Sequence, residues 1–324
     1  MKDFRNLERE ETQKIVNLKV VGVGGAGNNA INRMVEDRVR NVEFIAINTE
    51  SKVLRLSKAD KIIQIGKETT RGLSTGGIVE LGEMAARENI EDIQKALYDA
   101  DMVFITAGMG GGTGTGAAPV VAEVAKSLGI LTIGIVTKPF IFEGIRRMNQ
   151  AKKGIEQLRK YVDALIVVSN DKLLKTIEKN STIIEAFKLA DGTLKQGVVG
   201  ITTLLSTTGL VNVDFNDIRS VMQNTGMAHL GMCEKTGEEA IREAVKGAAQ
   251  NALSETKING AKGVIINISG SKELSLAEIN SALTEITDDI DENANLIFGT
   301  IIDPRLKNKT VVTIIATGVE DVAL

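Results

Sequence analysis

Short apolar runs alternate with amphipathic segments through the first half of the chain. Runs of consecutive apolar residues are typical of strands that are buried on both faces of a parallel sheet. Such runs, some of them interrupted by single polar residues such as Lys19 and Glu43, occur at 18–23, 42–49, 61–65, 102–107 and 131–136. Between them, segments such as Ile78 to about Glu88 repeat apolar residues at helical spacing. The pattern predicts an α/β fold with a parallel, Rossmann-like sheet, whose ligands bind at the carboxyl ends of its strands.

The second half of the chain has a different pattern of apolar and polar residues. It begins with a long central helix that we expect from Ser181 to about Leu205. Strands are expected at 228–234, 263–268, 295–302 and 310–317, with helices at 238–253 and 275–287. This order predicts a smaller α+β domain with a mostly antiparallel sheet. The expected units are a flexible segment (1–14), a nucleotide-binding domain (15–180), the central helix (181–207), the second domain (208–318) and a tail (319–324).

Composition narrows the possible functions. The 324 residues, of which 43% are hydrophobic, supply enough apolar surface for two cores. Aromatic residues make up only 3% and the net charge is -3, so nucleic-acid binding is not expected. The single cysteine, Cys233, has no partner for an internal disulfide, and the charged start lacks the apolar core of a signal peptide. We therefore expect a cytoplasmic protein that does not bind membranes directly.

The segment Gly108–Gly116 carries the clearest chemical signal. It reads Gly-Met-Gly-Gly-Gly-Thr-Gly-Thr-Gly and separates a buried strand from a helix expected to begin near Ala117. Glycines let the backbone approach a ligand closely, and the start of a helix attracts anions. A flexible surface linker would seldom occupy such a position, and no Walker phosphate loop occurs in the chain. The candidate phosphate-binding residues here are Gly110, Gly111, Gly112, Thr113, Gly114 and Thr115, with the threonine hydroxyls available to phosphate or magnesium.

A second glycine segment follows the first strand. Its candidate residues are Gly24, Gly25, Ala26, Gly27, Asn28 and Asn29. Alone, this segment equally fits a Rossmann-type oxidoreductase that binds nicotinamide adenine dinucleotide, with Glu50 as the acid for the ribose. The segment Gly108–Gly116 and the distant position of the only histidine, His229, favour another nucleotide. Identifying the base of a copurified nucleotide would separate the two readings.

The sequence GGGTGTG at 110–116 is the signature of tubulin-like GTPases, and residues from about Ile15 to Gly318 resemble one branch of them, the FtsZ family. The resemblance implies a GTPase that binds GTP and GDP with Mg²⁺ and assembles head to tail into the cytokinetic ring at mid-cell. It also implies membrane-tethering partners bound through a C-terminal peptide, which we expect to be missing because the chain stops at Leu324. A tubulin-like filament protein with slow turnover and another role, such as shape control or plasmid positioning, stays open.

The resemblance assigns further residues to the nucleotide. The loop ending at Gly76 and Gly77 would face the terminal phosphate, although Ser74 and Thr75 replace the glycine and alanine common in relatives. Glu143 would contact the ribose and Arg147 the nucleotide, and Asn170 joins the candidates at the start of a short helix. Phe187 and Asp191 share one helix face, where a ring can stack on the base and a carboxylate can accept from guanine N1–H and its amino group. The alternative is that Phe187 is core and Asp191 surface.

The catalytic candidates are Asn212, Asp214 and Asp217. They lie 25 positions or more beyond Phe187, which corresponds to about 35 Å if most of the intervening chain is helical. The resemblance implies that this segment enters the nucleotide site of the next subunit, where the carboxylates polarise the attacking water. The simpler alternative is a polar loop in which Asp214 caps the following helix. His229 and Cys233 are two potential metal ligands without a third, so we expect packing residues there.

Overall fold

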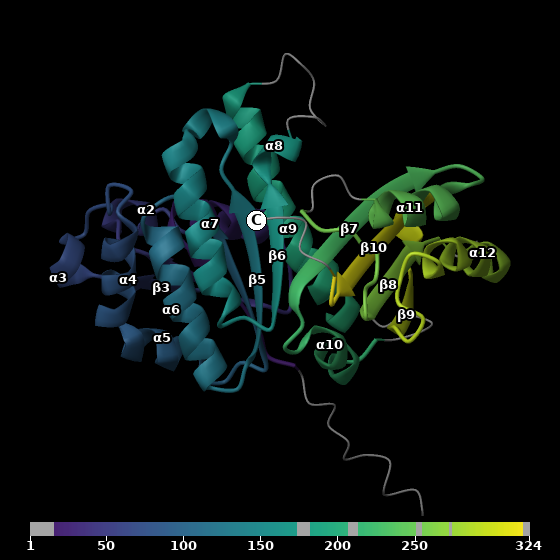
Figure 1. The fold of residues 1–324 in the computed structure, drawn as a ribbon, viewed down its shortest axis with the longest axis horizontal. Coiled ribbons are helices and arrows are strands. Elements are labelled where there is room, and N and C mark those ends of the chain that lie inside the picture. The colour runs from purple at the N-terminus through teal and green to yellow at the C-terminus, as the bar shows by residue number, and fades with distance from the viewer. Residues whose placement is uncertain (1–15, 174–181, 207–212, 251–254, 272–273, 320–324) are drawn as a thin grey trace, which may run out of the picture.

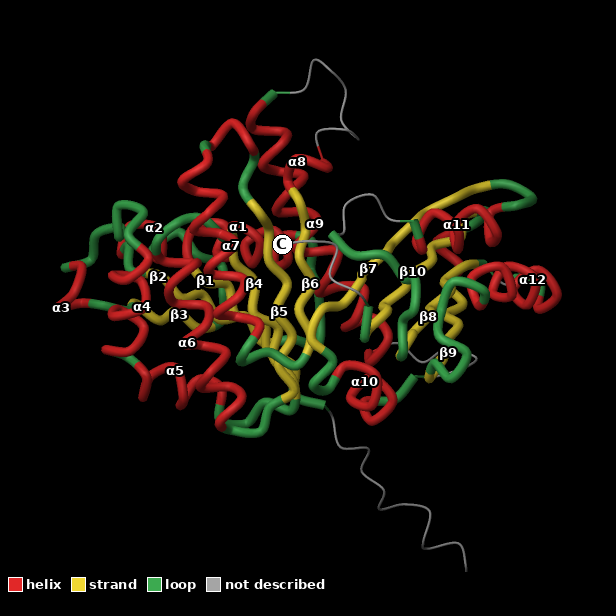
Figure 2. Tube along the Cα trace, in the orientation of Figure 1, coloured by secondary structure: helices red, strands yellow, loops and turns green. Residues whose placement is uncertain are grey.

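The computed structural model describes residues 16–173, 182–206, 213–250, 255–271 and 274–319. In this part of the chain, the strands form one continuous sheet in the order β3-β2-β1-β4-β5-β6-β7-β10-β8-β9. Figure 1 shows a larger half, with the early strands and their helices, beside a smaller half that contains α11 and α12. Figure 2 shows the strands running through the middle of both halves, with helices on the outside.

The larger half is built on parallel strands, as the apolar runs predict. The strands are β1 (Leu18–Val23), β2 (Glu43–Asn48), β3 (Lys61–Gln64), β4 (Met102–Gly108), β5 (Leu131–Lys138) and β6 (Ala164–Ser169). Each pairs in parallel with its neighbours in the sheet. The helices are α1 (Gly24–Glu36), α2 (Ser51–Leu54), α3 (Lys67–Thr70), α4 (Val79–Glu88), α5 (Ile90–Leu97), α6 (Thr113–Ser127), η2 (Ile141–Glu143), α7 (Ile145–Arg159) and α8 (Asn170–Leu173).

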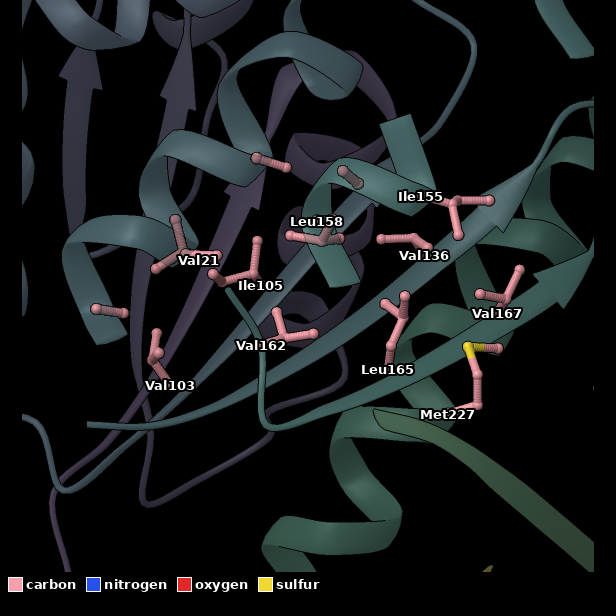
Figure 3. Packing of buried hydrophobic residues seen from close by; sticks show 14 of the residues in the cluster. Val21, Val103, Ile105, Val136, Ile155, Leu158, Val162, Leu165, Val167 and Met227 are labelled. Atoms are coloured by element: carbon pink, nitrogen blue, oxygen red, sulfur yellow. The ribbon is translucent and has the colours of Figure 1, made fainter. Parts of the chain in front are cut away.

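Two hydrophobic clusters cover opposite faces of this sheet. Along β4, Val103 and Ile105 belong to the cluster that contains α6 and α7, whereas Met102 and Phe104 belong to the cluster that contains α1 and α9 (Ile183–Ser206). Successive side chains of a strand point to opposite faces, so a continuous apolar run supplies both clusters. Figure 3 shows the first cluster, with Ile155 and Leu158 of α7 packed over the strands. Helices therefore cover both faces of the sheet.

The smaller half continues the same sheet. Its elements are α10 (Phe215–Met222), β7 (Gly226–Thr236), α11 (Ala240–Ala249), β8 (Gly263–Gly270), α12 (Leu276–Thr287), β9 (Asn295–Ile302), η3 (Pro304–Leu306) and β10 (Lys309–Thr317). β10 is antiparallel to both β7 and β8, while β8 and β9 are parallel. The prediction of a mostly antiparallel sheet is confirmed. The sequence pattern did not reveal that β7 pairs with β6, through Ala164–Gly226 and Leu165–Met227, and joins both halves.

Both glycine segments are partly helical. We expected a helix to begin near Ala117, but α6 begins at Thr113, and α1 begins at Gly24 inside the other glycine segment. The reason is close packing: a Cβ on Gly27 would lie 2.4 Å from the Thr106 carbonyl oxygen, and one on Gly116 would lie 2.1 Å from the Val79 carbonyl oxygen. Several of these glycines let a helix sit directly against another backbone. The loop after β4 is correspondingly short.

The long central helix α9 has 24 residues, or about 35 Å at 1.5 Å per residue. It begins beside α8, which lies at the top of the view in Figure 1, whereas α10 lies at the bottom. Among the residues that the structure describes, no helix has the length and apolar character needed to span a bilayer.

Candidate nucleotide-binding site

A cavity of about 320 Å³ lies at the carboxyl ends of the parallel strands. It is centred where β1 and β4 are neighbours, the point at which the strand order reverses direction. Open α/β sheets bind ligands at such a crevice, because the loops on either side diverge there. The position of the cavity agrees with the sheet edge that the sequence pattern predicts.

Thirteen of the nineteen predicted nucleotide-binding residues line this cavity. They are Gly25, Ala26, Gly76, Gly77, Gly111, Gly112, Thr113, Gly114, Glu143, Arg147, Asn170, Phe187 and Asp191. Residues from the start of α6 lie directly on the cavity wall, where the first N–H groups of a helix have no partner within the helix. This wall can therefore receive phosphate oxygens.

The other six predicted residues, namely Gly24, Gly27, Asn28, Asn29, Gly110 and Thr115, do not line the cavity. Asn28 is buried, donates to the Gly22 carbonyl oxygen at 2.8 Å and accepts from Asn48. The Thr115 hydroxyl accepts from the Gly110 N–H at 2.8 Å. Asn28 and Thr115 therefore stabilise the loops through hydrogen bonds within the protein. The glycine motif does not distinguish this role from contact with a ligand.

Three threonine hydroxyls fix the loop that contains Gly76 and Gly77. Thr113 Oγ1 lies 3.1 Å from Thr49 Oγ1 and 3.4 Å from Thr75 Oγ1. Thr75 is buried, and a Cβ on Gly112 would come within 2.0 Å of its hydroxyl. Gln150 of α7 also donates to the Gly77 carbonyl oxygen at 3.2 Å. Thr75 thus packs this loop against the start of α6.

The opposite end of the cavity is suited to a planar base. The Phe187 ring is 40% exposed and meets Phe140 edge to face at a centroid distance of 5.3 Å. Asp191 follows one turn later and is only 8% exposed. Asn170 is 5% exposed, and its Oδ1 has no hydrogen-bond partner among the residues that the structure describes. A buried acceptor without a donor is costly, so this atom fits a donor supplied by a ligand.

Asp191 forms an ion pair with Arg33 of α1, which does not line the cavity and whose Nε donates to Asp191 Oδ2 at 3.1 Å. Burial raises the pKa of the Asp191 carboxyl above its ordinary value, and the hydrogen bond and charge of Arg33 oppose that rise. Sequence reasoning missed Arg33, since it lies 158 positions from Asp191 and forms part of no motif.

Glu143 and Arg147 form an ion pair on the cavity wall. Arg147 Nη1 donates to Glu143 Oε2 at 2.5 Å, and Glu143 Oε1 accepts from the Phe140 N–H at 2.9 Å. Glu143 is thereby held at the end of η2, while Arg147 stays half-exposed. Both side chains can reach a polar ligand group, as the resemblance implies.

Asp214 and Asp217 do not line the cavity and instead cap α10. Asp214 Oδ1 accepts from the Asp217 N–H at 2.8 Å, and Asp217 Oδ2 accepts from the Asp214 N–H at 3.0 Å. This reciprocal capping box gives both Asp214 and Asp217 a structural role, whereas the capping alternative had assigned one to Asp214 alone. Asp214 is exposed. Asn212 lies outside the described residues.

Several cavity residues were not predicted as ligands, among them Asn48, Glu50, Thr137 and Pro139. Glu50 was expected to contact a ligand only in the oxidoreductase alternative. All four follow or end a parallel strand. Polar residues at strand ends were the signal that could have found Asn48, Glu50 and Thr137.

The strand order, the glycine-lined wall and the apolar base end define a nucleotide-binding α/β protein. Comparison with known proteins identifies the class further. Residues 17–178 match the Tubulin/FtsZ family, GTPase domain, and residues 226–320 match the FtsZ family, C-terminal domain.

Solved structures agree. An empty FtsZ dimer from M. jannaschii is 43% identical, with a TM-score of 0.89 over 95% of this chain and 89% of that one. CetZ1 from Haloferax volcanii, a GDP-bound monomer, is 24% identical with a TM-score of 0.82, over 95% and 96% of the two chains. CetZ2 from the same organism, in a GTPγS-bound protofilament, is 19% identical with a TM-score of 0.81, over 94% of each chain. The last two show a shared fold.

The chain belongs to the FtsZ family of tubulin-like GTPases. It is therefore an enzyme that binds GTP and GDP and hydrolyses GTP. This membership excludes the oxidoreductase alternative.

Proposed function

We propose that the chain hydrolyses GTP in a site that two copies share, and that it assembles head to tail into filaments. The observation that carries this proposal is the separation of binding and acidic groups. The cavity lies at the start of α9, whereas the exposed Asp214 lies beyond its other end, about 35 Å away along the helix. The acids of one copy can act only on the nucleotide of another. A contact between unlike ends need not close, so it propagates.

In the proposed binding mode, the phosphates lie along the glycine wall formed by the segments after β1 and β4 and by Gly76 and Gly77. The ribose lies beside Glu143 and Arg147, and the base stacks on Phe187. Asp191 accepts from the two donors on the guanine edge, a pairing that adenine does not offer. Asn170 Oδ1 provides a further acceptor at the same end. The dimeric and filamentous states of the similar structures support self-association.

Asp214 and Asp217 of the next copy, with Asn212, would orient the attacking water and polarise it. Magnesium would neutralise charge that develops on the phosphates. Among the described residues, no group of three or more His, Cys, Asp or Glu side chains could hold a metal ion. We therefore propose that phosphate oxygens and water supply most of its ligands, which is common for Mg²⁺.

The cellular role that fits this activity is the cytokinetic ring of cell division, with the protein in the cytoplasm at mid-cell. Membership of the FtsZ family supports this role. A fluorescent fusion of the chain, expressed in cells depleted of their own copy, would show a mid-cell band. A diffuse or plasmid-associated signal would favour another filament function.

Turnover at different protein concentrations tests the shared site. A shared site requires that GTP hydrolysis per subunit rises steeply with concentration, together with light scattering. Hydrolysis per subunit that is independent of concentration, in solutions without assemblies, would contradict the proposal.

A further inference from the structure

We propose that Arg33 is a positioning residue for guanine recognition, which fixes the Asp191 carboxylate at the base end of the cavity. Arg33 does not line the cavity, whereas Asp191 does. Arg33 therefore acts through Asp191 and not on the nucleotide. The inference rests on the proposed role of Asp191.

The geometry favours this role. Asp191 has a side chain that is 11% exposed, and a carboxylate so poorly hydrated needs a charged or hydrogen-bonding partner. Within the described residues, Arg33 is the only donor to it, and it uses Oδ2. Oδ1 and the second lone pair of Oδ2 are left to accept from N1–H and the amino group of guanine. Without Arg33, no hydrogen-bond donor among the described residues would orient the Asp191 carboxylate.

The charge of Arg33 also determines the form of Asp191 that is present. Burial favours the protonated acid, which would place a hydrogen where the base needs an acceptor. Arg33 faces Asp191 from α1; across the cavity, the charged side chains are Glu50, Glu143 and Arg147. Because Glu143 and Arg147 neutralise each other, Arg33 is the main group that favours the ionised carboxylate.

The same two helices provide a matched control. Lys195 of α9 pairs at 2.7 Å with Asp37, the C-cap residue of α1, and this pair has the same sequence separation of 158 as Arg33 and Asp191. It lies one turn further along both helices, away from the cavity. Lys195→Gln therefore removes an α1–α9 ion pair without touching Asp191.

The experiment compares Arg33→Gln, Arg33→Lys and Lys195→Gln by equilibrium binding of GDP, which carries the same base and avoids hydrolysis. Arg33→Gln should bind GDP about tenfold more weakly near neutral pH, as expected when a charge-assisted contact is lost. On acidification, Arg33→Gln should also begin to lose GDP binding at a higher pH than the unmodified protein, because the pKa of Asp191 rises further without Arg33. Arg33→Lys, which keeps the charge, should recover much of the pH profile. Lys195→Gln should match the unmodified protein.

Asp191→Asn separates the two proposals. Xanthine carries a carbonyl where guanine carries the amino group, so an amide in place of the carboxylate should favour xanthosine diphosphate over GDP. If Asp191→Asn still prefers GDP, the proposed base recognition is wrong. If it changes preference while Arg33→Gln retains the affinity and pH profile of the unmodified protein, the inference about Arg33 is overturned and base recognition stands. Should Arg33→Gln not fold, an unchanged affinity and pH profile in Arg33→Leu or Arg33→Met, whichever folds, has the same consequence.

Discussion

Gly25 differs from the other glycines in the two segments after β1 and β4, because nothing lies within 4 Å of a Cβ built on it. It lines the cavity, and its φ is not in the left-handed region. Gly25→Ala should therefore fold with unchanged stability. If phosphate approaches this backbone, the added methyl group should still weaken GDP binding by about tenfold or more, since charged hydrogen bonds are lost.

Gly112→Ala is the contrasting variant. Its Cβ would meet the Thr75 hydroxyl at 2.0 Å and the Ile78 carbonyl oxygen at 2.7 Å, so the loop must move. We expect both lower stability and lost binding. Thermal unfolding and GDP titration of both variants check the prediction; normal GDP affinity in Gly25→Ala would show that the nucleotide does not approach there.

A buried lysine at the other end of the sheet links stability to pH. Lys19 is fully buried, donates to the Ala96 carbonyl oxygen at 2.7 Å, and pairs with Asp99 and Glu43. The hydrogen bond from Lys19 holds the pKa of Asp99 below its ordinary value. A carboxyl with a lowered folded-state pKa contributes stability that is present above its unfolded pKa and is lost as pH falls through the folded value.

Asp99→Asn should therefore lower the thermal midpoint at neutral pH and reduce its further fall on acidification. Glu91→Gln, at an exposed and weakly paired position, is the control and should follow the unmodified protein. Midpoints measured from pH 7 to pH 3 check the prediction. Parallel curves for Asp99→Asn and the unmodified protein would contradict it.

At the scale of the elements, α10 complicates any test of catalysis. Asp214→Ala would remove the N-cap and cost about 1 kcal/mol of stability besides any chemical effect. Asparagine caps helices as well as aspartate, but it is a poor base. Asp214→Asn should therefore keep the stability and GTP affinity of the unmodified protein and lose about a hundredfold or more in turnover.

Thermal unfolding, GTP binding and assembled-state turnover of Asp214→Asn and Asp214→Ala separate the cap from the chemistry. Equal turnover in Asp214→Asn and the unmodified protein would leave Asp214 with the capping role alone.

Elements with a strong periodic signal were predictable from the sequence. The continuous apolar runs fixed the parallel strands, because such runs need burial on both faces. The start of α6 was misplaced, since the sequence does not distinguish a glycine that permits close helix packing from one that permits a loop. The partners Arg33 and Thr75 could not be found from local patterns, because each depends on contacts between distant segments.

At the scale of the whole molecule, both hydrophobic clusters extend through the two halves and join them. β6 and β7 share two residue pairs, and Lys138, at the end of β5 beside the cavity, pairs with Glu255 at 3.4 Å. The long helix α9 separates the nucleotide from the acids. Under the proposed function, this arrangement would put the two parts of one active site at unlike ends of the molecule and so connect hydrolysis with assembly.

Mixing two inactive variants tests the shared site most directly. Gly112→Ala should lack nucleotide but keep its acids, while Asp214→Asn should hold GTP but present no catalytic carboxylate at that position. Provided that both kinds stack in one filament, the acids of the first can act on the GTP of the second. The measurement is GTP turnover of each variant alone and of the mixture at constant total protein. The shared site predicts that the mixture recovers part of the activity, whereas a mixture with no more turnover than the sum of its components, despite co-assembly seen by scattering, would contradict it.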